Sequence, residues 1–213
     1  ATAALGSDKV TSLLMPSPWS SASSTKDAIT LSKRLKFQSH IVPIESLMKS
    51  FDIALSKPLG QLPGGITAEN LQSRIRGTIL MALANQEGHL LLSTGNKSEL
   101  AVGYCTLYGD MNGGLSVIGD LYKTEVFELC EWLDRQTSKA FRNQFQLPLT
   151  GPLIGDAILK KPPSAELRPG QLDSDSLPDY NILDPILKGL IEDRSSTEQL
   201  ISMGNEPALV EQI

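Results

Sequence analysis

Short apolar runs that alternate with longer amphipathic stretches constrain this chain more than any other feature. Val10–Met15, Phe37–Ile44 and Leu90–Leu92 have the length and composition of strands, and segments with helical spacing separate them. Such alternation is typical of βαβ units, in which a helix connects two parallel strands. The sequence therefore predicts an α/β fold, with a parallel twisted sheet flanked by helices.

Helical spacing is clearest over Thr67–Gln86, where four apolar residues fall on one stripe: Leu71, Ile75, Ile79 and Leu83. The pattern changes after about Leu147, and Lys160–Pro178 combines four prolines with almost no periodicity. A loop this long in a compact domain is usually functional or mobile. We therefore expect an α/β core over residues 1–150, and a lid loop followed by short C-terminal helices over residues 151–213.

Composition excludes several classes of protein. Of 213 residues, 40% are hydrophobic and 20% charged, which argues against a disordered chain. The net charge of -5 and the absence of a basic run argue against nucleic acid as a partner. No apolar stretch approaches the length of a membrane span, and no signal peptide is visible. The two cysteines form neither a disulfide framework nor a metal-ligand spacing, which favours a cytoplasmic protein.

The junction after Leu90–Leu92 is the most informative local pattern. An apolar strand runs into Ser93-Thr94-Gly95-Asn96 and then into a segment with helical character. Ligands of open α/β sheets bind at the carboxyl ends of strands, and free N–H groups at a helix start attract anions. Thr94 could thus contact a nucleotide and Glu99 a hard cation such as Mg²⁺. An ordinary capped helix explains the same residues.

Two further patterns have a functional and a structural interpretation. Asn70 and Arg74 are four residues apart on one face of the Thr67–Gln86 helix, where they could bind a phosphate, a carboxylate or a second subunit. A solvated helix face is the simpler interpretation. Lys123 lies in the first turn of a helix that Asp120 is expected to cap, where the helix dipole disfavours a cation. A bound phosphate would reverse that effect, and nearby acidic side chains would also compensate it.

Familiar catalytic motifs are absent. His40 and His89 are isolated, and there is no GxSxG, HExxH or Walker-type lysine loop. The glycine-containing loop Gly109–Gly114 would let a ligand approach the backbone, but such a loop is weak evidence by itself. The residues alone therefore predict no nucleophile on the protein.

Five ordered blocks resemble the NAD synthetase family, in particular the synthetase domain of its glutamine-dependent form. They span nearly the whole chain at consistent intervals: Glu69–Arg76, Ser93–Tyr104, Thr106–Asp110, Gly119–Thr124 and Lys161–Pro169. The resemblance implies an adenine-nucleotide α-hydrolase-like, Rossmann-like fold. It also implies ATP-dependent amidation of deamido-NAD through an adenylated intermediate, with Mg²⁺ as cofactor and ammonia from a glutaminase domain.

The same resemblance implies roles for individual residues. Thr94, Lys123 and Ser164 correspond to ATP-binding positions, with Ser164 in the loop that closes over ATP. Asn70 and Arg74 correspond to positions that bind deamido-NAD at a homodimer interface. Glu99 would bind Mg²⁺ or the substrate, and Asp110 is a weaker candidate on the substrate side.

Three departures from the family pattern limit what the 213 residues are expected to do. Relative to the family pattern, the first strand, the pyrophosphate-binding motif Ser-Gly-Gly-x-Asp-Ser that follows it and the glutaminase domain are expected to be missing from these residues. We therefore expect residues 1–213 alone to be inactive. Two alternatives stay open, namely another ATP-pyrophosphatase with a different acceptor, and a non-catalytic nucleotide-binding or assembly module.

Overall fold

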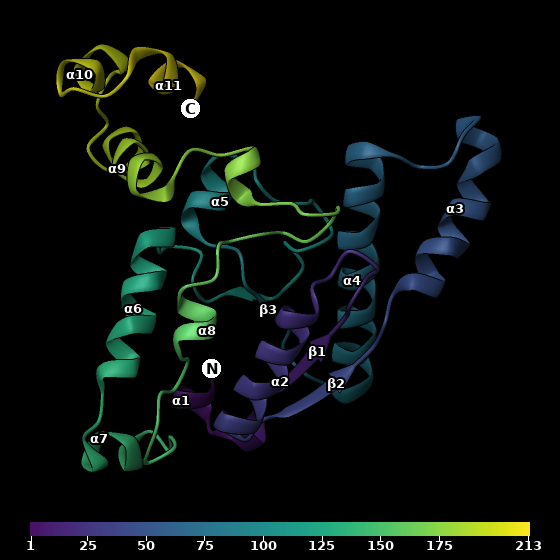
Figure 1. The fold of residues 1–213 in the computed structure, drawn as a ribbon, viewed down its shortest axis with the longest axis vertical. Coiled ribbons are helices and arrows are strands. Elements are labelled where there is room, and N and C mark those ends of the chain that lie inside the picture. Colours follow the sequence, from purple (N-terminus) through teal and green to yellow (C-terminus); the bar gives the residue numbers. More distant parts are fainter.

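Two small parallel sheets form the centre of the molecule. In the computed structural model, which describes residues 1–213, β1 (Thr11–Leu14) pairs with β2 (Gln38–Ile41) and β3 (Leu92–Ser93) with β4 (Leu115–Ser116). Both pairs are parallel, and helices surround them (Figure 1). The predicted α/β class with parallel strands is confirmed, but the strands form two sheets instead of the one that the sequence predicted.

An open space separates the two sheets. A cavity of about 770 Å³ is lined by residues of β1 and its flanks, by Leu90–Leu92 and by the facing side of the long helix α4 (Gly65–Glu87). All four residues of β1 are only partly buried. The edges of β1 and β3 have no strand between them, and for this reason the sheet is divided.

The helices have the following bounds: α1 (Thr2–Leu5), α2 (Ala22–Leu35), α3 (Glu45–Leu59), α4 (Gly65–Glu87), α5 (Lys97–Ala101), α6 (Lys123–Arg135), α7 (Lys139–Gln144), α8 (Asp156–Leu159), α9 (Tyr180–Ile191), α10 (Thr197–Ser202) and α11 (Pro207–Gln212). Two short 3₁₀ turns complete the structure, η1 (Ser7–Lys9) and η2 (Asp173–Asp175).

Helix α6 begins later than the sequence suggested. Its N-cap is Tyr122, and the carboxylate of Glu125 accepts a hydrogen bond from the Tyr122 backbone N–H at 2.8 Å. Asp120, the predicted cap, is instead exposed and forms an ion pair with Lys97 at 3.2 Å. The predicted cap was wrong, but Lys123 does occupy the first turn.

The buried core is concentrated around α9. One apolar cluster joins Tyr122 to Leu183 and Leu187, and a second joins Ile186 to Leu200 and Val210. The two faces of α9 thus pack against α6 on one side and the C-terminal helices on the other. This core holds α5 and α6 against α9.

At the opposite side of the molecule, α3 runs beside α4 and extends away from the rest of the chain (Figure 1). Its apolar side chains remain accessible, and Ile53 is 77% exposed. No helix is both long enough and apolar enough to cross a bilayer.

Candidate functional site

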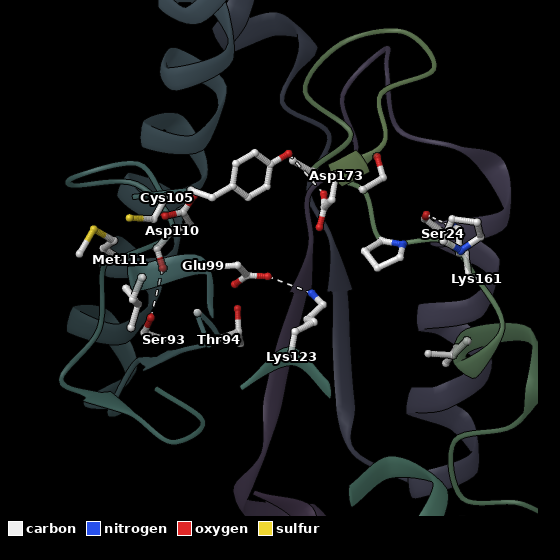
Figure 2. Close-up of a pocket in the computed structure, with 18 residues that line it drawn as sticks. Ser24, Ser93, Thr94, Glu99, Cys105, Asp110, Met111, Lys123, Lys161 and Asp173 are labelled. Carbon is white, nitrogen blue, oxygen red and sulfur yellow. Dashed lines mark hydrogen bonds and ion pairs between the residues drawn. The ribbon is translucent and has the colours of Figure 1, made fainter. Parts of the chain in front are cut away.

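A cavity of about 390 Å³ opens at the carboxyl end of β3. Five of the seven residues predicted from the sequence line it, which are Thr94, Glu99, Asp110, Lys123 and Ser164. They come from the β3–α5 junction, the loop after α5, the start of α6 and the lid loop, Lys160–Pro178. Figure 2 shows Thr94, Glu99 and Lys123 facing one another across this cavity. The structure thus brings together residues that are distant in the sequence.

Glu99 is positioned by the first turn of α5. Asn96 and Glu99 form a capping box, in which the Glu99 N–H donates to Asn96 Oδ1 at 3.0 Å and the Asn96 N–H donates to Glu99 Oε2 at 3.2 Å. The other carboxylate oxygen, Oε1, accepts a hydrogen bond from Lys123 Nζ at 2.9 Å. The predicted capped helix is therefore present, and it also directs one carboxylate oxygen into the cavity.

The ion pair between Lys123 and Glu99 explains how a cation is tolerated at a helix start. Both side chains are more than four-fifths buried, at 18% and 19% exposure. The carboxylate offsets the unfavourable interaction between the Lys123 ammonium and the positive end of the α6 dipole. The ammonium also lies 5.4 Å from the centre of the Tyr180 ring, within cation–π range. Asp120 pairs with Lys97 instead, whereas Glu125 lies in the first turn of α6 and accepts the Tyr122 N–H.

Asp110 lines the cavity, but its carboxylate also braces its own loop. Oδ1 accepts a hydrogen bond from the Thr106 N–H at 2.8 Å, and Oδ2 accepts one from Ser73 Oγ at 3.2 Å. The Asp110 N–H donates back to Ser73 Oγ at 3.0 Å. This carboxylate therefore fixes the loop after α5 against α4.

Asn70 and Arg74 lie outside the cavity. Asn70 Oδ1 accepts a hydrogen bond from Thr106 Oγ1 at 2.8 Å, and Arg74 Nε donates to the Leu107 carbonyl at 3.2 Å. Both side chains thus attach α4 to the loop that carries Asp110. The exposed guanidinium of Arg74 retains donors that could meet a ligand or a second subunit.

Ser164 belongs to a closed segment of the lid loop. The Asp173 N–H donates to the Pro163 carbonyl at 3.0 Å, which joins the two ends of Pro163–Asp173. Within the segment, Ser164 Oγ donates to the Gln171 carbonyl, and the Leu167 N–H donates to Gln171 Oε1 at 2.8 Å. An Ω-loop has this form, with ends close together and its own side chains filling the interior.

A second set of contacts attaches the lid loop to the start of α2. Glu166, whose backbone adopts φ 50°, accepts hydrogen bonds from Ser24 Oγ and from the Ser21 N–H. Lys161 Nζ donates to the hydroxyl groups of Ser21, Ser23 and Ser24. Burial pushes the pKa of Glu166 up, but these hydrogen bonds and Lys161 together hold it below its usual value.

Among the lining residues that were not proposed as site residues from the sequence are Tyr104, Lys161 and Asp173. Asp173 accepts hydrogen bonds from the hydroxyl groups of Tyr180 at 2.9 Å and Tyr104 at 3.3 Å. Burial and the Asp173 charge raise the pKa of Tyr104 to about 12 and raise that of Tyr180 further. No local spacing in the sequence indicated the contacts of Asp173 with Tyr104 and Tyr180, because the three residues come from separate segments.

Cys105 lies on the cavity wall, but its chemistry there is unfavourable for a nucleophile. Burial, with smaller contributions from Asp110 and Glu99, raises the pKa of its thiol above the usual value. The neutral thiol is a weak nucleophile. The site therefore offers charged and hydrogen-bonding side chains, and the Cys105 thiol on its wall is not activated.

The side chains around the cavity suit a cation that is bound partly by substrate phosphates better than one that is bound by protein ligands alone. No cluster of three or more His, Cys, Asp or Glu side chains comes together as a metal site. Mg²⁺ is commonly held by one or two carboxylates together with substrate phosphates and water. Glu99 supplies one carboxylate at the cavity, so the residues present fit that arrangement.

Comparisons with known proteins identify the family that the chain resembles. The family model for NAD synthase matches residues 1–213. A glutamine-dependent NAD(+) synthetase of Synechocystis sp. is 52% identical over 210 residues, which cover 99% of this chain and 35% of that protein. The chain thus spans about a third of the length of this curated relative.

Solved structures show the same similarity. A glutamine-dependent NAD+ synthetase from Acinetobacter baumannii in complex with ADP has a TM-score of 0.68 and 38% identity, over 100% of this chain and 35% of that one. An NMN synthetase from Francisella tularensis has a TM-score of 0.66 and 27% identity, over 84% of this chain and 66% of that one. Since the family model covers every residue, the chain belongs to the NAD synthase family.

Proposed function

We propose that the protein containing these residues catalyses the ATP-dependent amidation of deamido-NAD to NAD, with ammonia derived from glutamine in a separate domain. The observation that carries the proposal is the convergence of Thr94, Glu99, Lys123 and Ser164 on one cavity. In this proposal residues 1–150 bind the nucleotides, and residues 151–213 supply the lid loop and supporting helices. Family membership supports the ligase activity.

ATP would occupy the cavity at the end of β3. The Lys123 ammonium would contact the phosphates, and the Thr94 hydroxyl and Ser164 would hydrogen-bond to the nucleotide. Binding of ADP by the related Acinetobacter baumannii enzyme supports the use of an adenine nucleotide. Phosphate would compete with Glu99 for Lys123, so ATP binding would exchange one partner of the ammonium for another.

The chemistry needs positioning and charge stabilisation more than a protein nucleophile. A carboxylate oxygen of deamido-NAD attacks the α-phosphorus of ATP, and the bond to the β-phosphate oxygen breaks to release pyrophosphate. Ammonia then attacks the activated carbonyl carbon, and AMP leaves with the transferred oxygen. Lys123 stabilises the negative charge that develops on the phosphates. Asn70, Arg74 and Asp110 would hold deamido-NAD.

Glu99 is the residue that would hold Mg²⁺ in this site. A bound Mg²⁺ would offset phosphate charge and make pyrophosphate a better leaving group. Freed from Lys123 by the incoming phosphates, the Glu99 carboxylate would present its Oε1 oxygen toward the nucleotide while Oε2 keeps the α5 cap. The capping box therefore preserves the carboxylate position in both states.

The cavity between the two sheets supports a fuller fold of the adenine-nucleotide α-hydrolase type. A further parallel strand between β1 and β3 would join both pairs into one sheet with helices on both faces. Such a strand, followed by a Ser-Gly-Gly-x-Asp-Ser loop, would supply backbone N–H groups to the pyrophosphate. The motif is not in the sequence, so residues 1–213 alone are proposed to be inactive.

A homodimer is the assembly that fits best. The exposed apolar side chains of α3, together with Ile66 at the start of α4, offer a surface for a second copy. Arg74 lies on α4 and retains free donors, so a partner subunit could complete the deamido-NAD site. Cytoplasmic residence and the absence of nucleic-acid partners remain part of the proposal.

A second candidate is amidation of the corresponding mononucleotide, favoured by the similarity to the Francisella tularensis NMN synthetase. The two reactions share the adenylation chemistry and differ in the adenosine half of the acceptor. Comparing kcat/KM for the dinucleotide and the mononucleotide in the full-length protein distinguishes them. The proposed function requires a clear preference for deamido-NAD.

The proposed reaction has a defined test. The full-length protein is incubated with ATP, Mg²⁺, ammonium and deamido-NAD carrying ¹⁸O in the pyridine carboxylate. We expect NAD, AMP and pyrophosphate in equal amounts, with one ¹⁸O atom in the phosphate of AMP. Formation of ADP and phosphate, or AMP without the label, would contradict adenylation of the carboxylate. A nucleotide-binding module would give no NAD at all.

A further inference from the structure

A buried carboxylate lies behind the cavity, and no step of the proposed reaction uses it. Asp184 of α9 is 4% exposed and is hydrogen-bonded to two hydroxyl groups, those of Ser98 and Thr124. Ser98 Oγ donates to Oδ1 at 2.5 Å, while Thr124 Oγ1 and the Thr124 N–H donate to Oδ2 at 2.8 and 2.9 Å. These bonds satisfy a charge that would otherwise be costly to bury.

The three residues form a single unit, here called the Asp184 node. Ser98 is fully buried, and its Oγ also accepts a hydrogen bond from the Lys123 N–H at 2.8 Å. The node therefore connects the first turn of α5 to the first turn of α6. The negative charge of Asp184 lies at the start of α6, where the helix dipole favours it.

The sequence neighbours of the node residues are Glu99 and Lys123, which form the ion pair at the cavity. Glu99 follows Ser98 in α5, and Lys123 precedes Thr124 in α6. The node fixes the backbone at both places, and the two side chains leave that backbone toward the same cavity. Its geometry thus sets where the ammonium and the carboxylate can lie.

Other contacts already attach α9 to α5 and α6. Lys97 binds Glu192 at 2.9 Å, and Tyr122 packs on Leu183 and Leu187 in the apolar core. Helix packing therefore does not depend on the Asp184 carboxylate alone. What the node adds is the orientation of two helix starts, because it binds their backbone and hydroxyl groups directly.

We propose that Asp184 is a positioning residue that holds Lys123 and Glu99 in register with the nucleotide. This inference rests on the proposed function, since register matters only if the pair acts on ATP. In Asp184→Asn an amide N–H₂ replaces one of the two acceptor oxygens, so either the Ser98 hydroxyl or the Thr124 groups lose their buried acceptor, and the helix starts must shift to satisfy them. A displacement of about 1 Å at a reacting group costs about 10²-fold in rate.

The test uses four variants of the full-length protein, assayed for NAD formation with ammonia. Asp184→Asn is expected to lower kcat about 10²-fold. KM for ATP should stay within about threefold, because the remaining nucleotide contacts are kept. Thr124→Val is expected to lower kcat less, and Thr124→Ser, which keeps the hydroxyl, should restore it. Asp193→Asn, an exposed neighbour at the end of α9, should match the wild type.

Amide hydrogen exchange supplies a readout that is independent of turnover. The Lys123 and Thr124 amides should lose protection in Asp184→Asn, while core amides of α9 such as that of Leu187 keep theirs. Wild-type kcat in a folded Asp184→Asn, or an unchanged Thr124 amide, would overturn the inference, as would failure of Thr124→Ser to restore activity. If the wild type makes no NAD while the amides respond as expected, the proposed function fails and only the structural link remains.

Discussion

The Lys123 ammonium lies 2.9 Å from a Glu99 carboxylate oxygen, although 24 positions separate the two residues in the chain. Each side chain starts from the first turn of a different helix, and each is largely buried at the cavity. The pair is thus a preassembled positive and negative charge beside the proposed nucleotide site. Replacing either partner changes the charge of the cavity with little change in its shape, which makes separate predictions possible.

Lys123→Met is expected to lower kcat/KM for NAD synthesis in the full-length protein by about 10²- to 10³-fold, because a group that stabilises developing charge is lost. Steady-state kinetics with ATP as the varied substrate measures the effect. Lys139→Met on α7 is the matched control, since Lys139 is exposed and does not line the cavity. An equal loss of kcat/KM in both variants would show that Lys123 has no specific role in the reaction.

Glu99→Gln should shift the Mg²⁺ dependence of the reaction. A glutamine at this position still accepts the Asn96 N–H, so the α5 cap and the stability of the fold should be kept. The amide is a weaker ligand for Mg²⁺ than a carboxylate, so half-maximal activity should need at least about tenfold more Mg²⁺. Activity measured against Mg²⁺ concentration tests this, and an unchanged midpoint would assign Glu99 to the substrate instead.

The attachment of the lid loop to α2 should weaken at acid pH, because the Glu166 carboxylate becomes protonated there. Its pKa is lower in the folded protein than in the unfolded chain, so ionised Glu166 stabilises the closed loop above the usual glutamate pKa. That contribution is lost as the pH falls through the lowered value. Limited proteolysis within Lys160–Pro178 should therefore speed up on acidification in the wild type. Glu166→Gln should be cleaved faster at neutral pH, with little further change in acid.

The apolar face of α3 should carry the proposed dimer contact. Ile53→Glu places a charge in that contact and is expected to raise the dimer dissociation constant by at least about 100-fold. Ile182→Glu on α9 is the control, because Ile182 is also exposed and lies on a different part of the molecule (Figure 1). Sedimentation velocity of the full-length protein measures both. If Ile182→Glu alone dissociated the dimer, the dimer contact would not lie on α3.

Local patterns made the α4 helix, the β3–α5 junction and the first-turn position of Lys123 predictable. Each depends on spacing within one segment, as with the capping box of Asn96 and Glu99. Long-range partners were not predictable in this way. The bonds between Asp184 and Ser98 and between Asp173 and Tyr104 join segments 86 and 69 positions apart, and neither leaves a periodic signal.

Local patterns first pointed to most of the candidate residues, and the family resemblance assigned their roles and added Ser164. The structure shows which of them line one cavity. Sequence spacing could not predict that Ser164 and Thr94 line the same cavity, because the path of the chain between them determines how far apart they lie. The family pattern led us to expect that the first strand is missing, but not that the remaining strands would form two separate sheets. Alternating strands predict a parallel sheet, but they do not reveal whether every neighbouring strand is present.

The closed ends of Pro163–Asp173 have a kinetic consequence. Because the Asp173 N–H bonds to the Pro163 carbonyl, we expect the segment to leave α2 and α4 as a unit instead of unravelling from one end. Its hydrogen bonds to Ser21 and Ser24 at α2, and the bond that Gln72 Nε2 of α4 donates to the Leu167 carbonyl at 2.8 Å, would then break together. The lid loop would thus exchange between one closed and one open state. Kinetic measurements of its opening would then show a single relaxation phase.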